Sequence, residues 1–191
     1  MDPTGAKLVR AARAYIEDET GQVSEMVPLD GGLDRNCGVF VTLSEYPSMN
    51  LRGCIGIPEP VMPLRDALEQ AARSACHDPR FPPLSAEETD GVVVEVTVLS
   101  EPVDMDCPRS ELPEHIVIGR DGLIISYRGY RGLLLPQVAS EYRWTPEEFL
   151  SHLSLKAGLS RSTWKNESAR IQSFTGRVYH ETAPHGDIEE E

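Results

Sequence analysis

The chain has 191 residues, of which 40% are hydrophobic, and its 18 basic and 31 acidic residues give it a formal net charge of −13. This length fits one domain, or one domain with a small subdomain, and the apolar content is enough for a buried core. The negative charge works against binding to nucleic acid or to anionic membranes, which needs a positive field.

No run of 18 apolar residues occurs, and the first 13 residues lack the apolar segment of a secretory signal. We therefore expect a cytoplasmic protein with no membrane association. None of the four cysteines forms a Cys-x-x-Cys pair, so free thiols are expected in that compartment. The histidines and cysteines also lack zinc spacing, so we expect no metal and no cofactor.

The sequence pattern of the first half of the chain predicts two helices and two paired strands. Residues 4–19 have apolar residues at helical spacing and end before Gly21, while Gly31-Gly32 indicates a turn. Residues 38–43 and 51–57 alternate as strands and are expected to pair antiparallel around a loop that contains Pro47. A helix with a stripe of alanines is expected to start near residue 63.

The second half predicts further strands and one well-marked helix. Residues 92–99 form a strand with four valines on its buried face, and residues 116–118 and 123–126 flank a Gly-Arg-Asp-Gly turn typical of a hairpin. A capping box at Thr145-Pro-Glu-Glu148 starts a helix that ends before residue 158. A final strand is expected at residues 171–179.

Together these elements predict an α+β fold, mainly an antiparallel sheet flanked by helices, with a smaller subdomain. Residues 1–180 would form this single domain. Residues 181–191 contain five acids and no Lys or Arg, so we expect a disordered acidic tail there.

The hexapeptide Leu51-Arg-Gly-Cys-Ile-Gly56 concentrates a cation, a thiol and two glycines. Strand alternation places Arg52 and Cys54 on one face, roughly 6–7 Å apart, where the guanidinium would favour the nucleophilic thiolate. Gly53 and Gly56 would leave room for a small concave site. Two alternatives stay open, because Cys54 can be an apolar filler and Arg52 can pair with a carboxylate.

A second polar stretch is Asp78-Pro-Arg-Phe-Pro-Pro-Leu84, whose three prolines fix an extended path. We expect Phe81 to anchor it in the core. Arg80 is either a second cation that faces a pocket or the partner of Asp78 in a rigid crossover, and both readings stay open.

Four stretches stand in a characteristic order: Leu51–Gly56, Asp78–Leu84, Gly132–Ala139, and Glu147–Leu150 followed by Lys156–Leu159. Together they resemble the AMMECR1-domain family over residues 4–180. The resemblance implies an intracellular α+β protein with a main part and a smaller subdomain, and a family without an established activity. Carried over by position, the residues of interest are Arg52, Gly53, Cys54, Gly56, Arg80, Gln137 and Lys156.

The resemblance also implies partners. The family is associated with Memo-like and radical-SAM proteins in prokaryotes, so these are expected pathway partners. The chain has no Cys-x-x-x-Cys-x-x-Cys cluster and is therefore not itself the radical-SAM component. Ser154 departs from the pattern, because the family often has a cysteine there, and this argues against a mechanism with two thiols.

Three functions are compatible with these residues. The first is a thiol-dependent enzyme acting on a small anionic or carbonyl substrate, with Cys54 as nucleophile, Arg52 or Arg80 lowering its pKa, and His77 or His152 as the missing base. Gly53, Gly56, Arg80, Gln137 and Lys156 would bind the small molecule or peptide. The second is a non-catalytic adaptor that holds a peptide or partner protein in the same groove. The third, nucleic-acid binding, fits the charge least.

Overall fold

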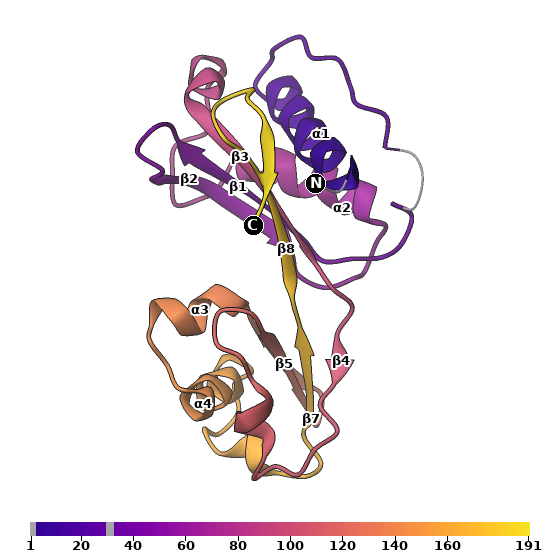
Figure 1. The fold of residues 1–191 in the computed structure, drawn as a ribbon, viewed down its shortest axis with the longest axis vertical. Helices are drawn as coiled ribbons and strands as arrows, with labels where there is room; N and C mark the ends of the chain where they lie inside the picture. The colour runs from indigo at the N-terminus through magenta and orange to yellow at the C-terminus, as the bar shows by residue number, and fades with distance from the viewer. Residues whose placement is uncertain (1–2, 30–32) are drawn as a thin grey trace. The chain divides into compact units, whose positions relative to one another are not determined.

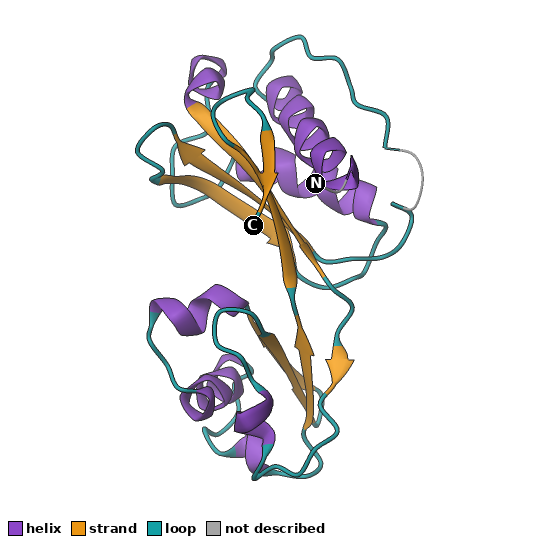
Figure 2. Cartoon of the chain, in the orientation of Figure 1, coloured by secondary structure: helices purple, strands orange, loops and turns teal. Residues whose placement is uncertain are grey.

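A computed structural model describes residues 3–29 and 33–191, and the expected Gly31-Gly32 turn lies outside these residues. The chain forms two compact units, one of residues 1–99 and 177–191 and the other of residues 100–176 (Figure 1). Helices accompany two mostly antiparallel sheets, which confirms the α+β class (Figure 2). No helix within the described ranges is long and apolar enough to span a membrane.

The first unit contains a five-stranded sheet in the order β2-β1-β3-β8-β9. Its elements are α1 (Pro3–Glu19), β1 (Val39–Glu45), β2 (Leu51–Ile57), α2 (Leu64–Ala75), the 3-10 helix η1 (Ala86–Gly91), β3 (Val92–Leu99), β8 (Gly176–Glu181) and β9 (Ile188–Glu190). The antiparallel pairing of β1 with β2 confirms the hairpin predicted around Pro47.

Helices α1 and α2 cover one face of this sheet (Figure 1). Both valines of β1 and four of β3 (Val92, Val94, Val96 and Val98) point into the same core as the apolar residues of both helices, because alternate strand residues share a face. Alanines of α2 are fully buried and let that helix lie close to the sheet. The opposite face carries the polar residues that alternate with the valines, among them Thr42 and Glu95, which are half-buried.

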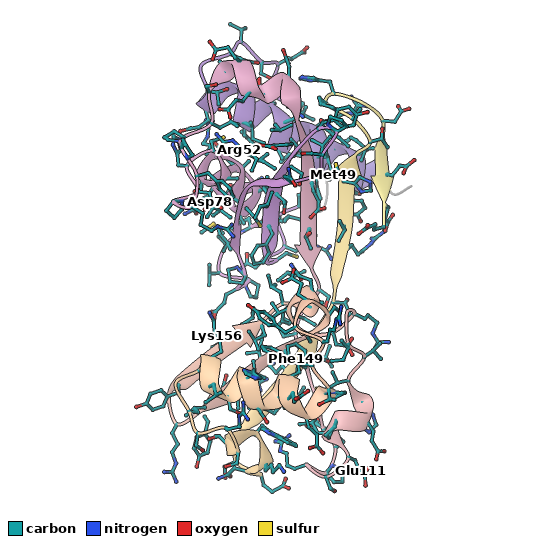
Figure 3. All side chains as sticks on the ribbon, turned by 90° about the vertical axis from the view of Figure 1, so that its left-hand side faces the viewer. Met49, Arg52, Asp78, Glu111, Phe149 and Lys156 are labelled. Carbon is teal, nitrogen blue, oxygen red and sulfur yellow. The ribbon has the colours of Figure 1, made fainter. Side chains whose placement is uncertain are left out.

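The second unit packs helix α4 on a four-stranded sheet in the order β4-β7-β5-β6. Its elements are β4 (Val103–Asp104), η2 (Leu112–His115), β5 (Gly122–Tyr127), β6 (Tyr130–Leu134), α3 (Pro136–Glu141), α4 (Pro146–Lys156), η3 (Thr163–Lys165) and β7 (Arg170–Phe174). The capping box of Thr145 and Glu148 begins α4 as predicted. Phe149, on the inner side of α4, is fully buried in this core (Figure 3).

The hairpin predicted around residues 119–122 is wrong. The hairpin of this region joins β5 to β6, and its turn is Arg128-Gly129, with φ of 49° and 85°. Positive φ at both central residues gives the turn the twist that a two-residue hairpin needs. Asp121 instead accepts a hydrogen bond from the N–H of Val117 and closes a local turn ahead of β5.

The acidic tail is not disordered in residues 188–190, which form β9 and pair antiparallel with β8. Ile188 is 4% exposed and packs in the first core. Glu181 is also buried, because its carboxylate binds the guanidinium of Arg13 and the N–H of Val94. The acidic composition of residues 181–191 did not predict this strand. Glu181 has a buried partner in Arg13, and Ile188 supplies apolar surface.

Candidate functional site

The hexapeptide forms β2, the edge strand of the first sheet, and this strand contains a bulge at Arg52. Leu51 pairs with Ser44 and Gly53 pairs with Leu43, so the register shifts by one residue between them. A bulge interrupts the alternation of side chains. Arg52 is consequently buried, at 7% exposure, and the predicted arrangement with Arg52 and Cys54 side by side on one face is wrong.

Arg52 instead forms a two-pronged ion pair with Glu88 of η1. Its Nε and Nη2 atoms lie 2.9 Å and 3.1 Å from the two carboxylate oxygens. The hydrogen bonds from Arg52, followed by the backbone N–H of Ser85, lower the pKa of Glu88 to about 2. This pair borders a pocket of about 270 Å³ that is also lined by Tyr46 and Ser48. The alternative reading of Arg52 as the partner of a carboxylate is therefore confirmed.

Asp78 and Arg80 hold the outer edge of β2 at Cys54. The N–H of Cys54 donates to Asp78 Oδ2 at 2.9 Å, and Arg80 Nη2 donates to the Cys54 carbonyl at 3.3 Å. Asp78 (labelled in Figure 3) also binds Arg80 directly at 2.6 Å, so the contact of the crossover reading, one of the two left open for Arg80, is present. The Arg80 guanidinium holds the pKa of this buried carboxyl far below its usual range. Leu84, at 6% exposure, anchors the loop, whereas Phe81 is only half-buried.

The two glycines of the hexapeptide serve close packing and do not leave a hollow. A methyl carbon added at Gly53 would lie 2.5 Å from the carbonyl oxygen of Ala75, at the end of α2. One added at Gly56 would collide with the ring of Phe40 on the neighbouring strand. The space that we expected to be open is thus filled by backbone at one glycine and by an aromatic ring at the other.

Polar side chains from four neighbouring strands form a row that begins at Cys54. The hydroxyl of Thr42 on β1 donates to the sulfur of Cys54 at 3.4 Å, and Thr42 is in register with both Cys54 and Glu95 of β3. Thr42 and Thr97 lie near enough to the Glu95 carboxylate to lower its pKa, and Glu95 also interacts electrostatically with His180 of β8. This row lies on the face of the sheet opposite α1 and α2.

Burial and neighbouring groups shift the pKa values of Cys54 and Glu95 in this row. Burial raises the pKa of the Cys54 thiol, the Thr42 hydroxyl and Arg80 lower it, and Glu95 raises it again. Burial likewise raises the pKa of the Glu95 carboxyl, with a smaller contribution from Glu191 in the same direction. The arrangement therefore presents a protonated thiol one hydroxyl away from a carboxylate that is a stronger base than usual.

Most of the remaining predicted residues belong to the second unit. Gln137 on α3 and Lys156, the last residue of α4, are exposed residues of the second unit. His152 belongs to the same unit and stacks on Trp144, with ring centroids 3.9 Å apart. His77 lies 2.9 Å from a carboxylate oxygen of Glu19.

Sequence reasoning missed Thr42, Glu95 and His180, although part of the signal was present. Glu95 and Thr97 alternate with the valines of residues 92–99, so they had to face away from the core. Which residues of other strands stand beside them depends on register. Across the described ranges, no group of three His, Cys, Asp or Glu side chains is placed to hold a metal ion.

Comparisons with known proteins agree with this fold. A family model described as AMMECR1 matches residues 9–179. The chain belongs to the AMMECR1 family. It is 50% identical over 190 residues to protein MJ0810 of Methanocaldococcus jannaschii, covering 96% of this chain and 93% of that one. It is also 50% identical over 156 residues to a protein of Aquifex aeolicus, covering 81% of this chain and 80% of that one.

A solved structure of the same family matches the whole chain. The crystal structure of the uncharacterized protein PH0010 from Pyrococcus horikoshii has a TM-score of 0.81 and 43% sequence identity to this chain, and the match covers 100% of this chain and 98% of that one. The fold described above is therefore the AMMECR1 fold. The names of these relatives state no activity.

Proposed function

We propose that this AMMECR1-family protein is a thiol-dependent enzyme whose small-molecule site lies at Cys54, on the sheet face opposite α1 and α2. The observation that supports this most is the hydrogen bond from Thr42 to the Cys54 sulfur, in a row that continues to Glu95. An activated nucleophile needs a base that can take its proton, and here a hydroxyl would connect the half-buried thiol to that base.

Thr42 would relay the proton that Cys54 must lose. A threonine hydroxyl has a single proton to donate, so it serves either the sulfur or the Glu95 carboxylate at one time. When it donates to Glu95, its oxygen is free to accept the S–H proton. The thiol proton then moves to Thr42 as the hydroxyl proton moves to Glu95, which leaves a thiolate and a protonated carboxyl.

The reaction would be an acyl transfer. The Cys54 sulfur bonds to the carbonyl carbon of the substrate, and the carbonyl electrons move to oxygen. The leaving group then departs with its bonding pair and takes the proton held by Glu95, so that a thioester remains on Cys54. Water hydrolyses this thioester and returns the thiol.

The other predicted residues take different parts in this proposal. Arg80 positions β2 through Asp78 and the Cys54 carbonyl, so it is a positioning residue. Gln137 and Lys156 stay predictions as contacts of the substrate. The cytoplasmic location and the Memo-like and radical-SAM partners also stay predictions.

An ester that releases a coloured product tests the proposal. p-Nitrophenyl acetate should acetylate Cys54, as located by mass spectrometry, and the wild-type chain should release nitrophenolate at least tenfold faster than Cys54→Ala. Thr42→Val should slow the release. Thr97→Val is the matched control, because Thr97 also lowers the pKa of Glu95, but its partner in register on β1 is Phe40. Equal rates of nitrophenolate release by wild type and Cys54→Ala would exclude thiol-dependent catalysis at Cys54.

A second candidate is a non-catalytic interaction module. It is favoured by the raised pKa of Cys54 and by the internal pairing of Arg52 and Arg80, which leaves the hexapeptide rigid and the thiol mostly protonated. A partner that binds Cys54→Ser as tightly as wild type, together with no ester turnover, would support the module over the enzyme.

A further inference from the structure

The two arginines near the hexapeptide are neutralised within the protein. Arg52 is paired with Glu88 at 2.9 Å, and Arg80 is paired with Asp78 at 2.6 Å. Each guanidinium is held by its own carboxylate, although Arg80 still lowers the pKa of the Cys54 thiol electrostatically. The anionic substrate that the sequence suggested thus lacks a free cation among the residues that flank Cys54.

The face of the sheet that carries Cys54 is acidic. Glu95 is the first charged residue of the row, and Glu191 acts on it electrostatically from the C-terminal end of the chain. His180 of the row pairs in register with another acidic residue, Glu189 on β9. A ligand on this face therefore meets more negative than positive charge.

We propose that the Cys54 site takes electrophiles that carry a positive charge, such as an acyl compound with an ammonium group, and disfavours anionic ones. This inference rests on the proposed function, since it assumes that the Cys54 sulfur is the reacting atom. The electrophilic carbon would meet that sulfur while the ammonium group lies against the Glu95 carboxylate.

The spacing of the strands limits the size of such a ligand. β2 and β3 both flank β1, so Cys54 and Glu95 stand two strand spacings apart, about 10 Å between backbones. Both side chains reach toward Thr42 between them, which shortens the gap between sulfur and carboxylate. The cationic group would therefore sit only a few bonds from the electrophilic carbon, as in an aminoacyl compound.

Three methanethiosulfonate reagents of different charge test this inference on the intact chain. They are the neutral methyl, the cationic 2-aminoethyl and the anionic 2-sulfonatoethyl forms. In each, the Cys54 thiolate attacks the sulfenyl sulfur, a disulfide forms, and methanesulfinate leaves with the bonding pair. Rates at Cys54 are measured by mass spectrometry and divided by the rate of the same reagent with 2-mercaptoethanol, which removes intrinsic differences between reagents.

We expect the normalised cationic rate to exceed the anionic rate by about tenfold or more at low salt, because one nearby carboxylate acts on the two reagents in opposite directions. Glu95→Gln should reduce this ratio several-fold. Glu147→Gln, which removes an exposed acid from α4 of the second unit, should leave it unchanged. Circular dichroism confirms that each variant is folded.

Two other outcomes distinguish a failure of the charge preference from a failure of the proposed function. Equal normalised rates for the cationic and anionic reagents, with ready reaction of the neutral one, would overturn the charge preference and leave the thiol site standing. If the neutral reagent fails to modify Cys54 in the folded chain, the thiol is closed to ligands, and both the proposed function and this inference fall.

Discussion

The backbone N–H of Cys54 donates a hydrogen bond to the buried carboxylate of Asp78, 2.9 Å away. Arg80 completes the contact by donating to the carbonyl of the same cysteine. An edge strand normally leaves such groups to water or to another chain. Here two side chains of a proline-rich loop satisfy them, so the loop fixes the position of the candidate nucleophile.

Asp78→Asn should therefore destabilise the first unit by about 2 kcal/mol, because the amide loses the charge that binds Arg80 and the Cys54 N–H. The midpoint of urea unfolding, followed by circular dichroism, measures this. Asp66→Asn is the control, since that side chain is 58% exposed and its pairing with Arg65 is a surface contact. Equal midpoints for the two variants would mean that Asp78 does not hold β2.

Gly53→Ala should cost about 2 kcal/mol, since its methyl group would meet the Ala75 carbonyl oxygen and backbone cannot move aside cheaply. Gly56→Ala should cost less, because the ring of Phe40 can rotate away. Gly91→Ala has no atom within 4 Å of the added carbon and serves as control. Thermal unfolding ranks the three variants, and a Gly53→Ala midpoint equal to that of Gly91→Ala would contradict the close packing.

The ion pair of Glu88 predicts a pH-dependent stability. Its pKa is lowered from 4.5 to about 2, so the stabilisation is complete above pH 5 and is lost as pH falls toward 2. Glu88→Gln should accordingly be less stable than wild type at pH 7, and the difference should vanish near pH 2. With the carboxylate side chain 43% exposed, solvent screening limits the difference to about 1 kcal/mol. A difference that stays constant with pH would exclude the ion pair as its cause.

Alkylation of Cys54 by iodoacetamide should reach half its maximal rate above pH 9, because burial raises the pKa of this thiol above its ordinary 9.0. Glu95→Gln should lower that midpoint by removing a negative charge, and Thr42→Val should raise it by removing a hydrogen-bond donor to the thiolate. Rates at each pH come from mass spectrometry of the Cys54 peptide.

The same Glu95→Gln substitution shows whether Glu95 accepts the thiol proton or affects Cys54 only through its charge. If Glu95 accepts the thiol proton, the variant should alkylate faster below pH 9 and yet turn over p-nitrophenyl acetate more slowly. Parallel changes in both rates would show that Glu95 affects Cys54 only through its charge.

Local patterns in the sequence determined much of the secondary structure. The capping box at Thr145 predicted the start of α4, and the valines of residues 92–99 predicted the buried face of β3. Such features depend on neighbours within a few residues, so they can be recognised without knowing the fold. The four ordered stretches also predicted the family that the comparisons confirmed.

The site itself depended on contacts between distant residues. Arg52 was expected beside Cys54, but a bulge turned it toward Glu88, 36 residues away. Strand alternation assigns a face only while the ladder is regular, and a bulge depends on the partner strand. Contacts between strands also decided which side chains lie next to Cys54. Thr42 and Glu95 became its neighbours through the register of three strands, which no single stretch of sequence contains.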